Sequence, residues 1–354
     1  MKQLLVFSTQ LMETGGIESH ILEFCDKLSA RGVEITLIVP NFQMKPFEES
    51  RLKRSCKKLI VNKGKAGLRT MSWLFSKAFL MGFNSYDSLY TNGQGESLKI
   101  FATLIRRKKY WVHHHHTAGD LNDQATWGKL YWSTLKQANK VIACSYVNAG
   151  SMQTVLHRDI NVVPCFSRKI EVEKKDGKIN GSVKLGYYGR LIAEKGIDVL
   201  CSLSNDADCA GIEFHVWGQG ENYPSAYFKK FPALKYHGTF NGTAGLTEVI
   251  TLLDGFLLIS THPEGLPVCL LEAMGAGLPW LATNKGGITD IAFDPLSTRV
   301  IASTLSYEEI KREVILFAEA LKSGNVDRSK QIEMYNKKFA ASAITTQWEE
   351  VLAL

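Results

Sequence analysis

The stretch D-G-F-L-L-I-S-T-H-P-E-G-L-P-V-C-L-L-E-A-M-G-A-G-L-P-W-L-A-T-N-K-G-G, residues 254–287, contains the clearest signals of fold in the chain. Residues 255–259 form an apolar run with the length of a buried parallel strand, and a polar loop follows it. Pro267 suits the first turn of a helix, and Gly275 and Gly277 mark the end of that helix before a second apolar run. The order strand, loop, helix, strand predicts one unit of an α/β fold.

Two carboxylates of this stretch stand eight residues apart, Glu264 in the loop and Glu272 inside the helix. The backbone amides at the start of the helix and the positive end of its dipole can hold a phosphate. Carboxylates do not bind phosphate, but they accept hydrogen bonds from sugar hydroxyls. The stretch therefore predicts a site for a sugar nucleotide.

The segment E-G-L-P-V-C-L-L-E-A-M-G-A-G-L-P resembles the signature of the family 4 retaining glycosyltransferases. These enzymes have the GT-B fold, in which two Rossmann-like, doubly wound α/β domains face a central cleft and a C-terminal helix returns to the N-terminal domain. The resemblance implies that Glu272 binds the nucleotide ribose and that Glu264 contacts the donor sugar. It also implies that the donor site includes Gly265, Leu266, Pro267 and Val268.

The composition fits a soluble globular protein with room for two domains, since the 354 residues are 45% hydrophobic and 22% charged. The apolar runs are shorter than a membrane span and no signal peptide pattern is present, so we expect a cytoplasmic protein. The seven cysteines include no C-x-x-C pair, which argues against a disulfide framework and against a structural zinc site. The net charge of +7 indicates an acidic partner.

The first forty residues predict a strand, a glycine turn at Gly15 and Gly16, an amphipathic helix and a second strand. The turn lacks the third glycine and the acidic residue of a dinucleotide fingerprint, so no nicotinamide or flavin cofactor is expected. The resemblance implies that Gly15, Gly16 and Ile17 belong to the acceptor-binding loop, with Gly16 also near the donor. A plain tight turn is the alternative.

Four consecutive histidines, residues 113–116, end another predicted strand and are followed by T-A-G-D. Side chains alternate along a strand, so His114 and His116 should lie on one side of it. No further ligands with metal-binding spacing accompany them, and we predict no metal site. The resemblance implies a histidine beneath the reacting sugar, with a role in catalysis and acceptor binding, and His116 fits this position best because Thr117 follows it.

The predicted domains are residues 1–167 for the acceptor, 168–335 for the donor, and a terminal segment 336–354 that packs on the first domain. The motif G-R-L-I-A-E-K-G resembles the phosphate-binding motif of the same family, which implies that Arg190 and Lys195 neutralise the diphosphate. Gly218 and Gly220 match a weaker glycine pattern on the nucleotide side. Family members often have Asn-Gly after the proline at position 164, whereas this chain has C-F-S.

Residues 51–83 combine many basic side chains with apolar and aromatic ones, and the basic run R-R-K-K at 106–109 follows later. A helix with this composition can lie on an anionic membrane surface at the inner face of the cell membrane. A core helix with a solvated basic side explains the pattern equally well. No nucleic-acid-binding motif accompanies the charge, so no nucleic acid partner is expected.

These patterns indicate a sugar-nucleotide enzyme, and the family resemblance implies a retaining hexosyltransferase that moves a sugar from a nucleoside diphosphate sugar, such as a UDP sugar, to an acceptor. The expected acceptor is a lipid-linked glycan in bacterial surface polysaccharide or lipopolysaccharide synthesis. No Asp-x-Asp pair ends a strand, so no catalytic metal or other cofactor is expected. A sugar-nucleotide epimerase, a phosphorylase and a non-catalytic sugar-nucleotide-binding subunit remain as alternatives.

Overall fold

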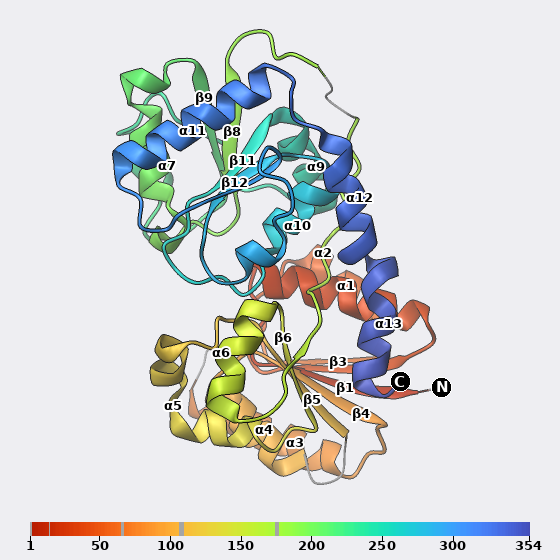
Figure 1. Ribbon diagram of the computed structural model, residues 1–354. Coiled ribbons are helices and arrows are strands. Elements are labelled where there is room, and N and C mark those ends of the chain that lie inside the picture. Colours follow the sequence, from red (N-terminus) through yellow and green to blue (C-terminus); the bar gives the residue numbers. More distant parts are fainter. Residues whose placement is uncertain (1, 14, 65–66, 106–109, 174–176) are drawn as a thin grey trace. The chain divides into compact units, whose positions relative to one another are not determined.

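The computed structural model in Figure 1 describes residues 2–13, 15–64, 67–105, 110–173 and 177–354. The chain divides into two compact units. The N-terminal unit comprises Met1–Phe166 and Ala341–Leu354, and the C-terminal unit comprises Ser167–Ala340. Each unit contains one sheet of parallel strands covered by helices, which is the predicted pair of doubly wound α/β domains.

The sheet of the N-terminal unit has the strand order β3-β2-β1-β4-β5-β6-β7, and all of these neighbours pair in parallel. Its strands are β1 (Gln3–Ser8), β2 (Glu34–Val39), β3 (Lys58–Val61), β4 (Ser88–Asn92), β5 (Tyr110–His115), β6 (Lys140–Ala143) and β7 (Asn161–Val162). Its helices are α1 (Gly16–Ala30), α2 (Pro46–Ser55), α3 (Leu68–Gly82), α4 (Glu96–Ile105), α5 (Leu121–Leu135), α6 (Tyr146–Leu156) and α13 (Ala341–Leu352).

Successive side chains of the central strands enter two different cores. Leu4 and Val6 of β1 belong to the cluster that includes residues of α1, α2 and α13. Leu5 and Phe7 belong to the cluster that includes residues of α3 to α6. Because both faces of the sheet are covered, the strand is apolar throughout instead of alternating with polar residues.

The terminal helix α13 completes the first of these cores, as the C-terminal helix was predicted to do. Trp348 is fully buried, and its indole N–H donates to the Pro164 carbonyl oxygen at 3.2 Å. Its ring meets those of Phe24 and Tyr90 edge to face, at centroid distances of 5.4 and 5.7 Å. The last residues of the chain are therefore an integral part of the N-terminal unit.

Two separate helices, α12 (Arg328–Lys338) and α13, end the described chain. The amides of Phe339 and Ala340 both donate to the Tyr335 carbonyl oxygen at 2.8 Å, which ends α12. No glycine or proline marks this end in the sequence. Residues 336–340, which the sequence assigned to the terminal segment, lie in the C-terminal unit.

The sheet of the C-terminal unit has the strand order β10-β9-β8-β11-β12-β13, again with parallel neighbours. Its strands are β8 (Val183–Tyr188), β9 (Ile212–Trp217), β10 (Lys235–Tyr236), β11 (Gly255–Leu258), β12 (Trp280–Thr283) and β13 (Thr298–Ile301). Its α-helices are α7 (Ile197–Ser204), α8 (Ser225–Phe228), α9 (Gly242–Leu252), α10 (Val268–Gly275), α11 (Tyr307–Lys322) and α12, and its 3-10 helices are η2 (Ala193–Lys195), η3 (Ala207–Cys209) and η4 (Gly287–Asp290).

Each sheet has one topological switch point, where the chain leaves in opposite directions from two neighbouring strands. It lies between β1 and β4 in the N-terminal unit and between β8 and β11 in the C-terminal unit. In open α/β sheets, ligands bind beyond the carboxyl ends of the strands at such a point. The loops after these four strands are therefore the first place to look for function.

Among the described residues, no helix combines the length and the apolar character that crossing a bilayer requires.

The position of Trp348 predicts a large effect on stability. Trp348→Ala should lower the free energy of unfolding of the N-terminal unit by about 3–5 kcal/mol, because it leaves a cavity between α13 and the sheet. Urea unfolding followed by circular dichroism measures the change. Glu350→Ala, on the exposed side of the same helix, should change stability by less than about 0.5 kcal/mol. Equal effects of the two substitutions would contradict the assigned packing.

Candidate functional site

The two loops at the switch point of the C-terminal unit contact each other. One follows β8 and contains η2, and the other follows β11 and precedes α10. The Thr261 amide donates to the Glu194 carbonyl oxygen at 2.9 Å, and Ser260 Oγ lies 3.0 Å from the same oxygen. The predicted phosphate-binding motif and the predicted sugar-binding loop thus lie against each other.

Glu264 has a buried carboxylate that is fully engaged. The Lys195 ammonium lies 2.6 Å from each of its two oxygens, and the Ser260 hydroxyl donates to Oε1 at 2.6 Å. A buried carboxylate is stable only when a cation and hydrogen bonds compensate it. The structure therefore brings Glu264 and Lys195 together as an ion pair, a pairing that the sequence did not indicate.

The backbone of Glu264 is fixed by the K-G-G turn that follows β12. Glu264 and Gly286 form a parallel bridge, and the Gly287 amide donates to the Glu264 carbonyl oxygen at 3.0 Å. Gly286 has φ +58°, and a Cβ atom there would stand 2.1 Å from that same oxygen. Only glycine allows this close approach, so the turn is a structural requirement of the Glu264 loop.

Glu272 lies on α10 and is almost completely buried. Its Oε1 atom accepts a hydrogen bond from Arg168 Nε at 2.6 Å. Arg168 stands at the very start of the C-terminal unit, 104 residues from its partner. The second predicted carboxylate is thus also held by a cation, and sequence reasoning missed that cation.

Arg190 contrasts with Lys195, because its side chain is exposed and forms no ion pair with any residue that the structure describes. Its carbonyl oxygen accepts from the Tyr187 hydroxyl at 2.9 Å, which fixes the backbone. Nearby in the fold, Pro267 is the N-cap of α10, and α10 begins at Val268. An exposed guanidinium and a helix start are the features that bind phosphate.

Gly218 and Gly220 support the Arg190 loop by close backbone contact. The Gly218 amide donates to the Gly238 carbonyl oxygen at 2.7 Å, and the Leu191 amide donates to the Gln219 carbonyl oxygen at 3.0 Å. A Cβ atom at Gly220 would stand 1.7 Å from the Leu191 carbonyl oxygen. In this structure the two glycines act by letting two loops approach each other.

Three rings stack beside this turn. The ring centroid of His237 lies 5.2 Å from that of His215 and 4.3 Å from that of Trp217, and the ring planes are nearly parallel. His215 Nδ1 and His237 Nε2 are 3.0 Å apart. Burial and the neighbouring His237 lower the pKa of His215 to about 4, so this ring is neutral at physiological pH.

The switch point of the N-terminal unit carries the predicted glycine turn. Gly15 is the N-cap of α1, Gly16 is its exposed first residue and Ile17 packs against the core. The Glu18 carboxylate accepts from the Met12 amide at 2.8 Å and so holds the loop that precedes the helix. The arrangement leaves backbone, with no side chain, at the exposed end of α1.

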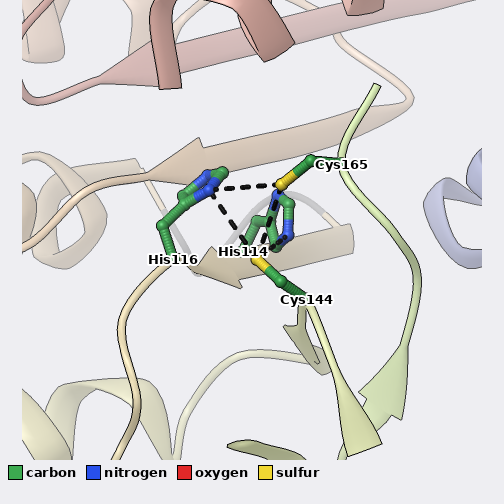
Figure 2. Close-up of side chains that lie close together, drawn as sticks. All are labelled: His114, His116, Cys144 and Cys165. Carbon is green, nitrogen blue, oxygen red and sulfur yellow. Dashed lines mark hydrogen bonds between the residues drawn. The ribbon is translucent and has the colours of Figure 1, made fainter. Parts of the chain in front are cut away.

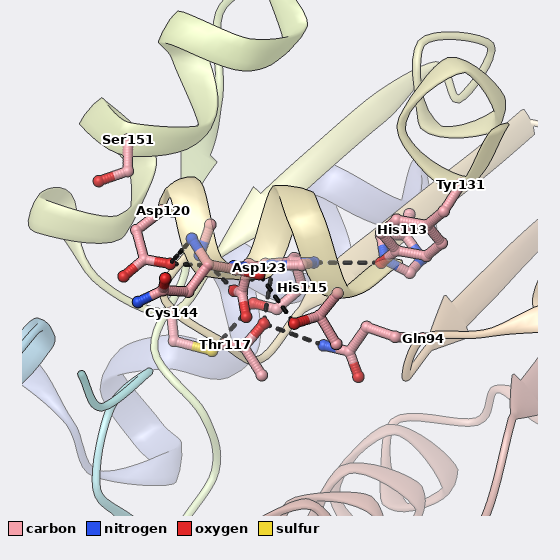
Figure 3. A network of polar contacts seen from close by, with 12 residues as sticks. Gln94, His113, His115, Thr117, Asp120, Asp123, Tyr131, Cys144 and Ser151 are labelled. Atoms are coloured by element: carbon pink, nitrogen blue, oxygen red, sulfur yellow. Dashed lines mark hydrogen bonds and ion pairs between the residues drawn. The ribbon is translucent and has the colours of Figure 1, made fainter. Parts of the chain in front are cut away.

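The histidine run separates into two faces, as predicted. His113 and His115 point toward α5, where both approach the Tyr131 hydroxyl, at 3.2 and 3.1 Å (Figure 3). His115 Nε2 also lies 2.9 Å from the Thr117 hydroxyl and 3.4 Å from Asp123. Burial disfavours the charged form of Asp123, but bonds from His115, Thr117 and the Gly119 amide outweigh it and hold the pKa at about 2.

On the opposite face, His114 and His116 lie beside two cysteines (Figure 2). Cys144 follows β6 and Cys165 follows β7, and their sulfur atoms are 3.5 Å apart. The prediction that no further metal-binding side chains accompany these histidines is therefore wrong. The cysteines are 28 and 49 residues from His116, and only the parallel sheet brings them to it.

The pKa values of the two thiols diverge. The hydrogen bond between them and their burial raise the pKa of Cys144. The same bond, together with His116, lowers the pKa of Cys165 to about 6 in spite of burial. The pair therefore includes one sulfur with thiolate character at neutral pH.

Comparison with known proteins identifies both units. Residues 14–166 match the family model described as Glycosyltransferase Family 4, and residues 182–315 match that described as Glycosyl transferases group 1. The chain has the GT-B fold, and each of its two units contains a match to a glycosyltransferase family model. The first match ends at the boundary between the compact units, and the second lies entirely within the C-terminal unit.

Solved structures of this fold resemble the whole chain. Anabaena Alr3699/HepE, solved with UDP and glucose, has a TM-score of 0.77 and 17% sequence identity, and the match covers 99% of each chain. Sucrose-phosphate synthase (tll1590) from Thermosynechococcus elongatus has a TM-score of 0.76 and 14% identity, over 99% of this chain and 98% of that one. At these identities the likeness shows the GT-B fold alone.

A sequence relative matches a shorter segment. The Arabidopsis thaliana sulfoquinovosyl transferase SQD2 is 33% identical over 105 residues, which are 30% of this chain. The match spans 20% of that relative's length.

The residues that sequence reasoning missed in this GT-B protein are those whose partners are distant in the chain. Arg168 and Ser260 each bind a predicted carboxylate, and Cys144 and Cys165 lie against predicted histidines. Parallel topology alone could have suggested the cysteines, because Cys144 directly follows a strand next to the histidine strand. No local signal distinguishes Arg168.

The lowered pKa of His215 predicts a pH dependence of stability. A histidine in the unfolded chain has a pKa of about 6.5, so it is protonated at a higher pH than His215 in the folded chain. The stabilisation that neutral His215 gives the folded chain is therefore complete above pH of about 6.5. It is lost as the pH falls toward 4, because only the unfolded chain takes up the proton in this range. Replacing His215 by Gln should therefore reduce the slope of unfolding free energy against pH by up to about 1.4 kcal/mol per pH unit in this window. Urea titrations at several pH values measure the slope. Equal slopes for both proteins would contradict the assignment.

Proposed function

We propose that this chain is a retaining glycosyltransferase that moves a hexose from a nucleoside diphosphate sugar to an acceptor. The observation that carries the proposal is the pair of buried, cation-bound carboxylates, Glu264 and Glu272, at the switch point of the C-terminal unit. The GT-B fold of the chain supports it, since the Anabaena protein of that fold was solved with UDP-glucose.

In this proposal Glu272 binds the ribose hydroxyls and Arg168 holds its carboxylate in place. The ion pair that Arg168 forms with Glu272 fixes the carboxylate on α10 before any ligand arrives. Because the Glu272 carboxylate is already ordered, the ribose can bind without the entropic cost of ordering that side chain. Gly265 and Leu266 then lead into the helix start, whose amides face the diphosphate.

A bound diphosphate is stabilised by cationic side chains that are not already paired with a carboxylate. The Lys195–Glu264 pair has no net charge as long as it stays closed. Arg190 therefore supplies the main compensation for the leaving group, and Lys195 contributes when the donor draws it away from Glu264. Glu264 is then released to accept a hydrogen bond from the donor sugar. These cations take the place of magnesium, so transfer should need none.

The N-terminal unit holds the acceptor in this proposal. Gly15, Gly16 and Ile17 form the exposed start of α1, and His116 follows β5 at the same carboxyl edge of the sheet. A parallel sheet brings all loops after its strands to one edge. His116 is the residue in this unit that can hydrogen bond with the reacting sugar.

The donor assignment is tested with conservative variants. Glu272→Gln should abolish most of the thermal stabilisation that a sugar nucleotide gives the wild type, because a charge-assisted bond to the ribose, worth about 1.5–3 kcal/mol, is lost. Glu264→Gln should keep that stabilisation but lower turnover at least about tenfold. A panel of sugar nucleotides is screened by thermal shift, and transfer is assayed without added magnesium.

Glu248→Gln, an exposed position on α9 of the same unit, is the matched control and should behave as the wild type. If both site variants bind and transfer at the parent rate, the donor site lies elsewhere. Selective stabilisation followed by epimerisation or hydrolysis without an acceptor would replace transfer with another reaction of the same site.

We further propose that the acceptor is a lipid-linked glycan, used in cell-surface polysaccharide synthesis, and that α3 contacts the membrane. This helix buries Leu74, Ala78 and Met81 against the N-terminal core. Its other side exposes large apolar residues, with exposed fractions of 91% for Leu68, 49% for Phe75, 62% for Phe79 and 51% for Leu80, and Phe83 follows at 70%. An apolar face of this size suits insertion at a membrane interface.

Four of the basic residues expected to face the membrane form ion pairs within the N-terminal unit. Arg51 pairs with Glu23 and Asp26, Lys57 pairs with Glu34, and Lys53 and Lys63 both pair with Glu49. Lys65 and the run 106–109 lie outside the described residues. The apolar face of α3, not the charge of α2, therefore carries the membrane proposal.

Vesicle binding tests this part of the proposal. Replacing Phe75, Phe79 and Phe83 by Ser should weaken binding to vesicles that contain anionic lipid at least about tenfold, because each buried phenyl ring contributes about 1.5–3 kcal/mol when fully inserted. Co-sedimentation measures the partition. The exposed Phe47→Ser on α2 is the matched control and should bind as the wild type does. Unchanged binding of the triple variant, or wild-type protein that stays in the supernatant, would end this proposal.

A further inference from the structure

We propose that His114, His116, Cys144 and Cys165 form a binding site for one Zn²⁺ ion in the N-terminal unit (Figure 2). One ligand atom from each residue lies within 4.8 Å of all the others. Two cysteines with two histidines is a common ligand set of structural zinc sites. The inference goes beyond the proposed transfer reaction and does not depend on it.

The distances between the ligand atoms approach those of a tetrahedral site. Zinc binds sulfur at about 2.3 Å and nitrogen at about 2.0–2.1 Å, so ligand atoms at tetrahedral angles are roughly 3.3–3.8 Å apart. Cys144 Sγ lies 3.5 Å from Cys165 Sγ and 3.2 Å from His114 Nε2. His116 Nδ1 lies 3.8 and 3.7 Å from the two sulfur atoms. The remaining pairs of ligand atoms lie within 4.8 Å, so a tetrahedral site requires side-chain adjustments of up to roughly an ångström.

The charges of the site also balance. Two thiolates and two neutral imidazoles around Zn²⁺ have no net charge, which matters because His114, Cys144 and Cys165 are at most 2% exposed. Zinc binds both sulfur atoms as thiolates, so any thiol proton still present is released on binding and the affinity for zinc should rise with pH. A site of soft sulfur and imidazole ligands prefers zinc to magnesium or calcium.

Residues behind the ligands hold His114 in the orientation that a metal needs. Its Nδ1 atom lies 2.9 Å from the Tyr90 hydroxyl, and that hydroxyl lies 3.0 Å from His20 Nε2. His20 is fixed in turn, because its Nδ1 accepts from the Phe166 amide at 2.9 Å. In the metal-bound form the His114 proton sits on Nδ1 and donates to Tyr90. Such outer partners are a regular feature of histidine metal ligands.

Zinc would also define the role of His116. Its Nδ1 atom faces the sulfur atoms, and its buried Nε2 atom has no hydrogen-bond partner among the described residues. Coordination through Nδ1 places the proton on Nε2, which makes that atom a permanent donor. If His116 contacts the acceptor or the reacting sugar, the metal would fix it in the donating form.

A disulfide between Cys144 and Cys165 explains the positions of the four side chains less well than a bound zinc ion does. The sulfur atoms are 3.5 Å apart, whereas a disulfide requires about 2.05 Å. A disulfide would also leave both histidines without a partner for the nitrogen atoms that face the sulfurs. The tetrahedral arrangement uses all four side chains.

Cobalt substitution tests the site on the full chain. Protein purified with reductant is stripped with chelator and titrated with Co²⁺, which should bind one to one and give the intense visible bands of tetrahedral cobalt with thiolate charge transfer in the near ultraviolet. Zinc should remove the bands. The double variant Cys144→Ser/Cys165→Ser should lose them, whereas Cys201→Ser/Cys209→Ser, which removes two buried thiols of the C-terminal unit, should retain them.

A second measurement needs no variant. X-ray absorption of the zinc-loaded wild type should show two sulfur ligands at about 2.3 Å and two nitrogen ligands at about 2.0–2.1 Å. Absence of cobalt bands in the wild type, equal bands in both double variants, an all-oxygen zinc shell, or a Cys144–Cys165 disulfide in the reduced, zinc-treated protein would each overturn the proposal.

Discussion

Parallel pairing of every described strand with its sheet neighbours is the constraint on which both candidate sites depend. It sends all loops that follow a strand to one edge of the sheet, whatever their separation in sequence. The loops after β8 and β11 meet there and bring Lys195 to Glu264 across 69 residues. The ends of β5 and β6 and the segment after β7 meet in the same way and bring His116 to Cys165 across 49 residues.

Burial then decides how the collected side chains must be paired. Glu264 and Glu272 are at most 7% exposed, and each has a cation at 2.6 Å. An unpaired carboxylate in these positions would cost several kcal/mol. The polar side chains are thus held in fixed positions before a ligand arrives, but each ion pair competes with the ligand for the same charged groups. A ligand that binds the Lys195 ammonium must interact with it more favourably than Glu264 does.

Much of this could be predicted from the sequence, because the decisive signals were local. The apolar runs and glycine turns predicted α/β units, and the family resemblance predicted that a final helix returns to the N-terminal domain. The alternation of His114 and His116 followed from strand geometry. What could not be predicted depends on distant partners: the Arg168–Glu272 pair, the approach of Cys144 and Cys165, and the closed Lys195–Glu264 pair.

The place of α13 in the N-terminal core has a consequence for how the protein is made. Ile344, Trp348 and Leu352 fill the core around β1, β4 and β5, but a ribosome adds them after the entire C-terminal unit. Domains usually fold in order of synthesis. Here the unit that is started first can be completed only last, so the nascent N-terminal segment keeps an unfilled apolar face during elongation. The C-terminal unit, whose residues 167–340 are continuous, has all of its own core as soon as it leaves the ribosome.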